Sequence, residues 1–170
     1  MRDKMYFTMK DFKEKQIAVS FKNKWEQKRF LKECEKERLE WFSGRKATDL
    51  MLPVDKCITY GYSDSDGLEF CKKEFYENKC WQVVKFNQIL FGEWKEVKRK
   101  ANVGDYIKLT NVIFSFDEKG YILKIDGLED CLPYVLGKNH IKDTGDNGEK
   151  WAYSEEEYVV LERVKRNEKI

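Results

Sequence analysis

The sequence predicts an α+β protein built from two small modules, and three observations lead to this prediction. One helical stretch of ordinary length lies near the start of the chain, whereas short apolar segments of strand length recur throughout. In the second half, turn-forming residues separate such segments about every 8–12 residues, which is typical of a small barrel or sandwich. The length of 170 residues suffices for one ordinary domain or two very small ones.

Composition indicates a folded protein with a balanced surface. Hydrophobic residues make up 41% and aromatic residues 15% of the chain, enough for a core. Charged residues reach 38% but leave a formal net charge of only +2, which argues against a dedicated duplex-DNA binder. No apolar run approaches the roughly 18 residues that span a bilayer, and residues 1–15 lack the apolar segment of a signal peptide. We therefore expect a cytoplasmic protein without a membrane partner.

Residues 17–86 predict a first module of order β-α-β-β-(short α)-β, after an N-terminal extension of residues 1–16. Alternation at Ile17, Val19 and Phe21 indicates a half-buried strand. Asn23 followed by Glu26 resembles a capping box at the start of a helix that runs to about residue 38. Turn residues 63–67 predict a hairpin between strands 57–62 and 68–71, followed by a helical turn at 74–78 and a strand at 80–86.

A second module is predicted for residues 97–162, after a connector of residues 87–96 and before a C-terminal tail of residues 163–170. The expected strands are residues 106–112, 121–125, 131–136 and 157–162. Residues 140–150 are polar and contain two glycines, which predicts a loop. This pattern favours a small β-barrel.

Two stretches of the chain resemble a known group of proteins. Residues 17–86, with FLKECEKERLEWFSGRKAT and CWQVVKF, resemble a small α+β module of accessory proteins of phages of low-GC Gram-positive bacteria. Residues 97–162, which begin VKRKANVGDYIKLTN and close with EEEYVVLER, resemble the SH3-like β-barrel that often ends such proteins. The resemblance implies a phage or prophage gene, of a kind that often counters bacterial immunity. It brings no catalytic motif that can be transferred residue by residue.

Metal, cofactor and catalytic motifs are not recognisable in the sequence. The five cysteines are irregularly spaced, and the closest two, Cys71 and Cys80, have eight residues between them, so we expect metal-free thiols. His140 is the only histidine and has no partner motif for a catalytic triad. A Walker-type phosphate loop is missing as well. We therefore predict a protein without a cofactor that is not an enzyme, although acidic groups such as Asp64 with Asp66 leave acid–base chemistry open.

The first candidate ligand site follows the predicted helix. It consists of an aromatic residue, two cations and two hydroxyl groups around Gly44, namely Trp41, Ser43, Arg45, Lys46 and Thr48. Such a loop can stack a base on the indole and hold a phosphate with its cations. The alternative is that Trp41 belongs to the core and that the two cations are ordinary surface residues.

A second candidate site combines Trp94 with the basic residues Lys98 and Arg99. An aromatic residue within a basic cluster is common where proteins contact nucleic acid or other proteins. The alternative is a solvated connector without a binding role.

Three functions fit these observations, in the following order. The first is a sponge, which sequesters a nucleotide immune signal without cleaving it. The second is an anti-CRISPR-like inhibitor that binds a defence protein directly, although such inhibitors are often acidic and this chain is not. The third is a nucleic-acid-binding accessory module, for which a local basic stripe would suffice. The expected partner is thus a nucleotide-type small molecule or a host defence protein, and a homo-oligomer is compatible with each function.

Overall fold

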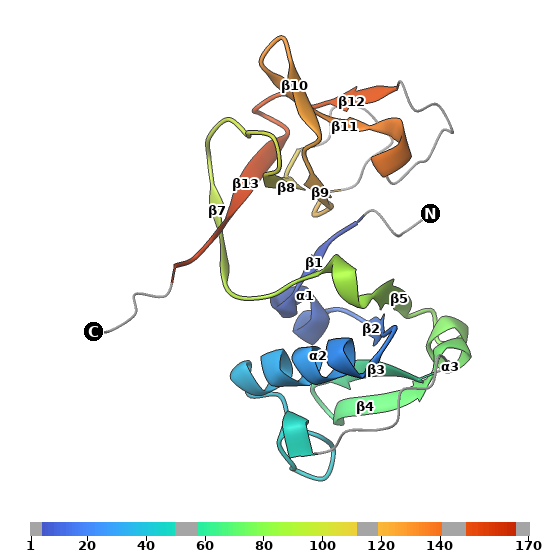
Figure 1. Ribbon diagram of the computed structural model, residues 1–170. Helices are drawn as coiled ribbons and strands as arrows, with labels where there is room; N and C mark the ends of the chain where they lie inside the picture. The colour runs from blue at the N-terminus through green and yellow to red at the C-terminus, as the bar shows by residue number, and fades with distance from the viewer. Residues whose placement is uncertain (1–4, 50–57, 112–118, 141–148, 166–170) are drawn as a thin grey trace. The chain divides into compact units, whose positions relative to one another are not determined.

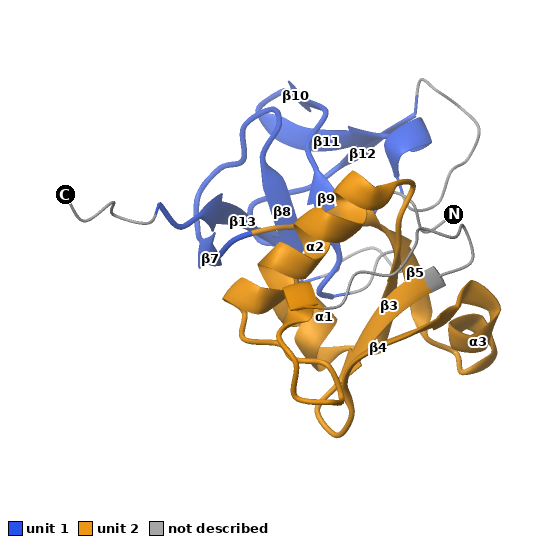
Figure 2. Ribbon diagram, turned by 60° about the horizontal axis from the view of Figure 1, so that its bottom comes forward, with its two compact units in different colours: residues 1–6, 92–170 blue, residues 7–91 orange. Residues whose placement is uncertain are grey.

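The computed structural model describes residues 5–49, 58–111, 119–140 and 149–165 (Figure 1). The chain forms two compact units: an N-terminal unit of residues 7–91, and a C-terminal unit of residues 1–6 and 92–170 (Figure 2). Helices and several sheets occur together, which confirms the predicted α+β class. None of the described helices is long and apolar enough to cross a membrane.

The N-terminal unit is organised around a four-stranded sheet of order β4-β3-β2-β5. Its strands are β2 (Ile17–Ser20), β3 (Ile58–Ser63), β4 (Gly67–Lys72) and β5 (Gln82–Lys85). The predicted hairpin is confirmed, because β3 and β4 pair antiparallel in a register that closes at Ser63 and Gly67. At Gly67 φ is +72°, and a Cβ there would lie 2.5 Å from the carbonyl oxygen of Glu40, so only glycine fits.

Helices α1 (Met9–Glu14) and α2 (Lys24–Lys36) cover one face of this sheet. Phe12 of α1 packs edge-on against Phe30 of α2, with ring centroids 5.0 Å apart. The α2 residue Gln27 donates a hydrogen bond to the hydroxyl oxygen of Tyr60 in β3. The predicted helix is confirmed, because Asn23 caps it by accepting the amide hydrogen of Glu26. Only half of the expected capping box forms, since the Glu26 carboxylate accepts the amide hydrogen of Lys22 instead.

Helix α3 (Lys73–Asn78) packs on the opposite face of the sheet. A Cβ added to Gly61 of β3 would lie 2.7 Å from Trp81 and 2.9 Å from Tyr76, so the sheet is tightly covered there. Every residue from Ile17 to Val19 is at most 1% exposed. The expected half-burial of this strand is therefore wrong, because a second layer covers the face that alternation assigned to solvent.

The compact N-terminal unit extends beyond residues 17–86 at both ends. Strand β1 (Phe7–Thr8) pairs parallel with β6 (Ile89–Leu90), which follows the 3-10 helix η2 (Phe86–Gln88). Residues 7–14, placed in the predicted extension, thus contribute a strand and a helix. A further 3-10 helix, η1 (Ala47–Asp49), contacts α2.

The C-terminal unit contains two antiparallel sheets. One has the order β7-β13-β8-β9 and is built from β7 (Trp94–Val97), β13 (Tyr158–Arg163), β8 (Tyr106–Leu109) and β9 (Ile122–Lys124). The other has the order β10-β11-β12, with β10 (Gly127–Glu129), β11 (Leu132–Leu136) and β12 (Lys150–Ala152), and the 3-10 helix η3 (Gly137–Asn139) follows β11. Their shared core includes Ile107, Leu123, Val135, Tyr158 and Val160.

Three strands of this unit lie where the sequence predicts none, and one of them, β10, occupies residues between two predicted strands. Strand β7 falls mostly in the predicted connector, and β12 begins at the end of the predicted polar loop. Strands β7 and β12 are short. Strand β7 pairs with β13, which is distant in the sequence, and β12 pairs with β11 across a loop. Long-range pairing of this kind leaves little trace in local residue patterns.

Candidate functional site

The first predicted site forms a tight loop beside the sheet. Glu40 and Lys46 pair across the loop, and Gly44 adopts a φ of +77° that lets the chain turn. Trp41 is only 5% exposed, and its indole N–H donates a 3.0 Å hydrogen bond to the carbonyl oxygen of Ala47. Its ring packs against Tyr60 and Phe70. Trp41 is therefore a core residue whose faces are already in contact with protein.

The polar members of this site are exposed on the same loop. Ser43, Arg45, Lys46 and Thr48 all reach solvent. The Thr48 hydroxyl donates to the Glu35 carboxylate, and the Lys46 amide donates to Asp49. A base stacked on Trp41 is not supported by this geometry. Anion binding by the Arg45 and Lys46 side chains stays a prediction.

The second predicted site is tied into the C-terminal unit by internal bonds. Arg99 donates hydrogen bonds to Asp105 (2.8 Å) and Glu162 (2.7 Å), and these bonds raise the pKa of its guanidinium. The Lys98 ammonium donates to the carbonyl oxygens of Glu155 and Tyr158. Trp94 is half-buried and packs edge-on against Tyr106. These cations join the segment after β7 to β13, which weighs against a basic stripe for nucleic acid here.

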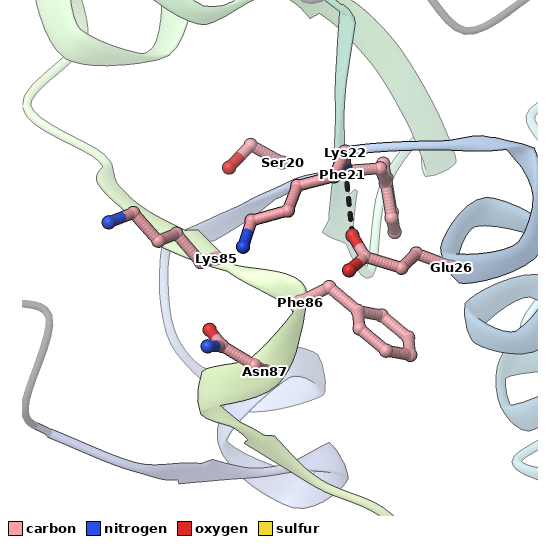
Figure 3. Close-up of a pocket in the computed structure, with 7 residues that line it drawn as sticks. All are labelled: Ser20, Phe21, Lys22, Glu26, Lys85, Phe86 and Asn87. Atoms are coloured by element: carbon pink, nitrogen blue, oxygen red, sulfur yellow. Dashed lines mark hydrogen bonds between the residues drawn. The ribbon is translucent and has the colours of Figure 1, made fainter.

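A pocket lies elsewhere, at one edge of the N-terminal sheet. Strands β2 and β5 are parallel and adjacent, with Ser20 opposite Lys85, so the chain leaves both strands at the same edge. A cavity of about 130 Å³ opens there (Figure 3), lined by Ser20, Phe21, Lys22, Glu26, Lys85, Phe86 and Asn87. The carboxyl ends of parallel strands are a frequent place for ligands, because loops and helix starts converge there. This cavity is the candidate functional site.

The polar groups of the pocket carry charge of both signs. Lys22, Lys85 and Asn87 are exposed, and Figure 3 shows their side chains around the same opening. The Glu26 carboxylate also lines the pocket, where it accepts the 2.8 Å hydrogen bond from the Lys22 amide. The Ser20 hydroxyl is used structurally, since it donates to the carbonyl oxygen of Val84. Two ammonium groups and one carboxylate leave one net positive charge among the lining residues.

Aromatic side chains form the wall and the rim of the pocket. Phe21 and Phe86 line it, with ring centroids 6.3 Å apart. Trp25, in the first turn of α2, meets Phe86 edge-on at 6.0 Å and is 69% exposed. An exposed indole therefore packs against one of the residues that line the pocket, and aromatic side chains near cations are expected at a nucleotide or single-strand site.

Sequence reasoning missed this site because its two halves are about 60 residues apart in the chain. A signal is nevertheless present. At the end of each strand the chain runs through a valine, one other residue, a phenylalanine and a polar residue: residues 19–22 for β2 and residues 84–87 for β5, with the last two residues beyond the strand. The match gains meaning only once β2 and β5 are known to pair in parallel.

The described residues contain no group of three or more His, Cys, Asp or Glu that could hold a metal ion. Cys34, Cys71, Cys80 and Cys131 are free thiols, and Cys57 lies outside the described residues.

No family model matches the chain, and no curated protein or solved structure matches it either. The resemblance to phage accessory proteins and the SH3-like character of the C-terminal unit thus stay predictions from the sequence.

Proposed function

We propose that this chain is a binding protein that sequesters a nucleotide-type ligand without cleaving it, and that the ligand's phosphate enters the pocket between Lys22 and Lys85. The observation that carries the proposal is the cavity itself, where two lysines line the opening at the ends of β2 and β5 and the exposed Trp25 packs against the lining residue Phe86. Sequestration of an immune signal by a phage protein is the biological role that the sequence resemblance suggests for this activity.

The size of the cavity indicates how such a ligand is held. Sites that enclose a whole small molecule usually measure about 300–1000 Å³, whereas this cavity measures about 130 Å³. It therefore accommodates one phosphate group, and the nucleoside lies outside on the rim. Stacking on an aromatic residue contributes about 1–3 kcal/mol per base, and a charge-assisted hydrogen bond about 1.5–3 kcal/mol. One stacked base and one such hydrogen bond from each lysine reach about −8 kcal/mol, which corresponds to micromolar binding, at the upper end of these ranges.

The pocket lining favours binding over catalysis. Its one hydroxyl, on Ser20, is oriented by a hydrogen bond to Val84, and its one carboxylate, on Glu26, is held by the Lys22 amide. A nucleophile needs a neighbouring base that accepts its proton, and the Ser20 proton points to a backbone carbonyl instead.

A direct inhibitor of a defence protein is the second candidate. The observation in its favour is Phe42, which is 80% exposed and follows Trp41 in the same loop, and Trp41 in turn packs against the partly exposed Phe70. Exposed aromatic residues are enriched among the residues that dominate protein interfaces.

Calorimetric titration with AMP, with its phosphate methyl ester and with the dinucleotide ApA tests the proposal. Replacing Lys22 and Lys85 together by Gln should weaken binding of these probes at least about tenfold. The matched control replaces Arg45 and Lys46 by Gln, which removes the same charge from exposed positions of the same unit. Chromatography of the recovered probe should show that it is intact.

Each alternative outcome has a clear meaning. If binding is lost only when Arg45 and Lys46 are replaced, the ligand site is in the loop that carries these two residues. If none of the probes binds the wild-type protein or either variant, the proposal is overturned and the inhibitor of a defence protein is favoured. Accumulation of cleaved probe in the presence of the wild type, but not of the pocket variant, would make the protein an enzyme.

A further inference from the structure

The exposed face of α2 carries a lysine row that begins next to the pocket. The row consists of Lys24, Lys28 and Lys32, which are exposed and follow one another at intervals of four residues. Residues at this spacing lie on one side of a helix, about 6 Å apart along its axis. The first turn of α2 reaches the cavity, because Glu26 lines it, and Lys22 lines it just before the helix. The row therefore leads from the pocket along the surface of the helix.

The lysine row carries positive charge that its own helix does not neutralise. In the parts of the chain that the structure describes, the three ammonium groups make no hydrogen bond or ion pair. The carboxylates of α2 bond to other groups, namely Glu26 to the Lys22 amide, Glu33 to Arg29 and Lys36, and Glu35 to the Thr48 hydroxyl. Like charges at this spacing repel, and a solvated helix normally alternates signs there. An external anion therefore explains the row better than solvation does.

An aromatic residue on the same side of the helix indicates which anion fits. Trp25 is 69% exposed, lies one turn before Lys28, and packs edge-on against the pocket residue Phe86. An exposed indole stacks only on an unpaired base, and cations beside aromatic residues characterise single-strand sites. Resting on the proposed function, we infer that the nucleotide-type ligand is a single-stranded nucleic acid, with one phosphate in the pocket and its next phosphates along the lysine row.

An anionic membrane surface, the other partner that attracts exposed lysines, fits this helix poorly. A helix that lies on a membrane turns its apolar face to the lipid. In α2 the apolar residues Phe30, Leu31 and Cys34 are buried, and Trp25 is the one large hydrophobic residue of the helix that is exposed. A nucleic-acid strand needs only the exposed charges and the indole.

Oligoadenylates of two lengths test the inference, since ApA reaches only the pocket and its rim, whereas a strand of about eight nucleotides also covers the lysine row. Calorimetric titration of the wild type should give at least about tenfold tighter binding of the longer strand. Replacing Lys24, Lys28 and Lys32 together by Gln should remove this gain, so that both strands bind with similar affinity. Between about 50 and 200 mM salt, the slope of log K against log salt for the longer strand should become shallower by about 2, because each phosphate contact contributes about 0.7.

Trp25→Leu separates stacking from charge. This variant should bind the longer strand about tenfold more weakly at fixed salt, with the salt slope of the wild type. The matched charge control replaces Lys72, Lys73 and Lys79 by Gln, because these exposed lysines lie in or beside α3, on the opposite face of the same sheet. The control should keep both the gain with length and the salt slope.

The outcomes separate this inference from the proposed function. A longer strand that binds no more tightly than ApA, or a gain that persists without the lysine row, would overturn the inference. So would row-dependent retention of the protein on phosphatidylcholine vesicles with about 30% phosphatidylserine, which would assign the row to a membrane. In these cases the proposed function stands if AMP and ApA still depend on Lys22 and Lys85.

Two further results bear on the pocket. Row-dependent binding of the longer strand that is indifferent to Lys22 and Lys85 would overturn the proposed function and leave the lysine row as the nucleic-acid surface. If neither ApA nor the longer strand binds the wild type, both proposals fail.

Discussion

The indole of Trp41 meets the ring of Tyr60 edge-on, with centroids 5.4 Å apart and an interplanar angle of 86°. Tyr60 is fully buried in the central part of the sheet, and its hydroxyl accepts a hydrogen bond from Gln27 of α2. The loop after α2 is therefore anchored by its aromatic residue to the same cluster that joins helix and sheet. The aromatic residue of this predicted ligand site is thus part of the hydrophobic core, whereas the polar residues of the site are exposed.

Trp41 and its neighbour Phe42 should respond very differently to truncation. Trp41→Ala removes a buried ring and should lower the free energy of unfolding by about 3–5 kcal/mol. Phe42→Ala changes a side chain that is 80% exposed and should stay within about 0.5 kcal/mol. Urea denaturation of both variants measures the difference. Equal losses in the two variants would show that Trp41 is not a core residue.

Gly61 should not tolerate even a methyl group. Gly61→Ala would place a Cβ 2.7 Å from Trp81 and 2.9 Å from Tyr76, so overpacking should cost about 1–3 kcal/mol. A double-mutant cycle with Trp81→Leu, measured by urea denaturation, checks the cause. The penalty of Gly61→Ala should be smaller in the Trp81→Leu background. An unchanged penalty would mean that the strain arises elsewhere.

Stability should fall at alkaline pH because of the buried Cys34 thiol. Burial, together with Glu33 and Glu37, raises the pKa of Cys34 well above its usual value. The folded state therefore keeps the proton that the unfolded state loses near pH 8.5. The stabilisation is complete below about pH 8.5 and decreases as pH rises, by up to about 1.4 kcal/mol per pH unit.

Urea denaturation between pH 7 and about pH 9.5 measures this dependence. Cys34→Ala should flatten the slope in that range, whereas Cys80→Ser, at an exposed thiol, should leave it as in the wild type. Above about pH 10 a further loss is expected, since burial also raises the pKa of Tyr76. A slope that survives Cys34→Ala would assign the alkaline sensitivity to another group.

His140 should be a structural residue of the C-terminal unit. It is fully buried, stacks on Trp151 with centroids 4.0 Å apart, and its Nε2 lies 3.1 Å from the Tyr153 hydroxyl oxygen. His140→Ala should lower the free energy of unfolding by about 2–4 kcal/mol, through the lost ring and the lost hydrogen bond.

Hydrogen exchange of the β11 and β12 amides provides a local measurement of this effect. Lys138→Ala, at an exposed residue two positions earlier, should leave their exchange nearly unchanged. Protection that persists in His140→Ala would show that the stack contributes little.

Local chemistry alone determined several elements of this protein. Asn23 starts α2 because its side chain satisfies the amide of Glu26, and this pattern is visible within four residues. The turn at 63–67 sets the β3–β4 register because Gly67 permits a left-handed conformation. Such signals survive in a single sequence because cause and effect lie a few residues apart.

Tertiary structure alone decided the rest, including the candidate site. The parallel pairing of β2 with β5 brings Lys22 and Lys85 to one pocket, although no local pattern specifies which distant strand β2 selects. Contact with Tyr60 places Trp41 in the core, while Trp25, equally aromatic in sequence, is left exposed at the pocket rim. Burial depends on which surfaces meet after the chain has folded, and that depends on long-range packing rather than on residue type.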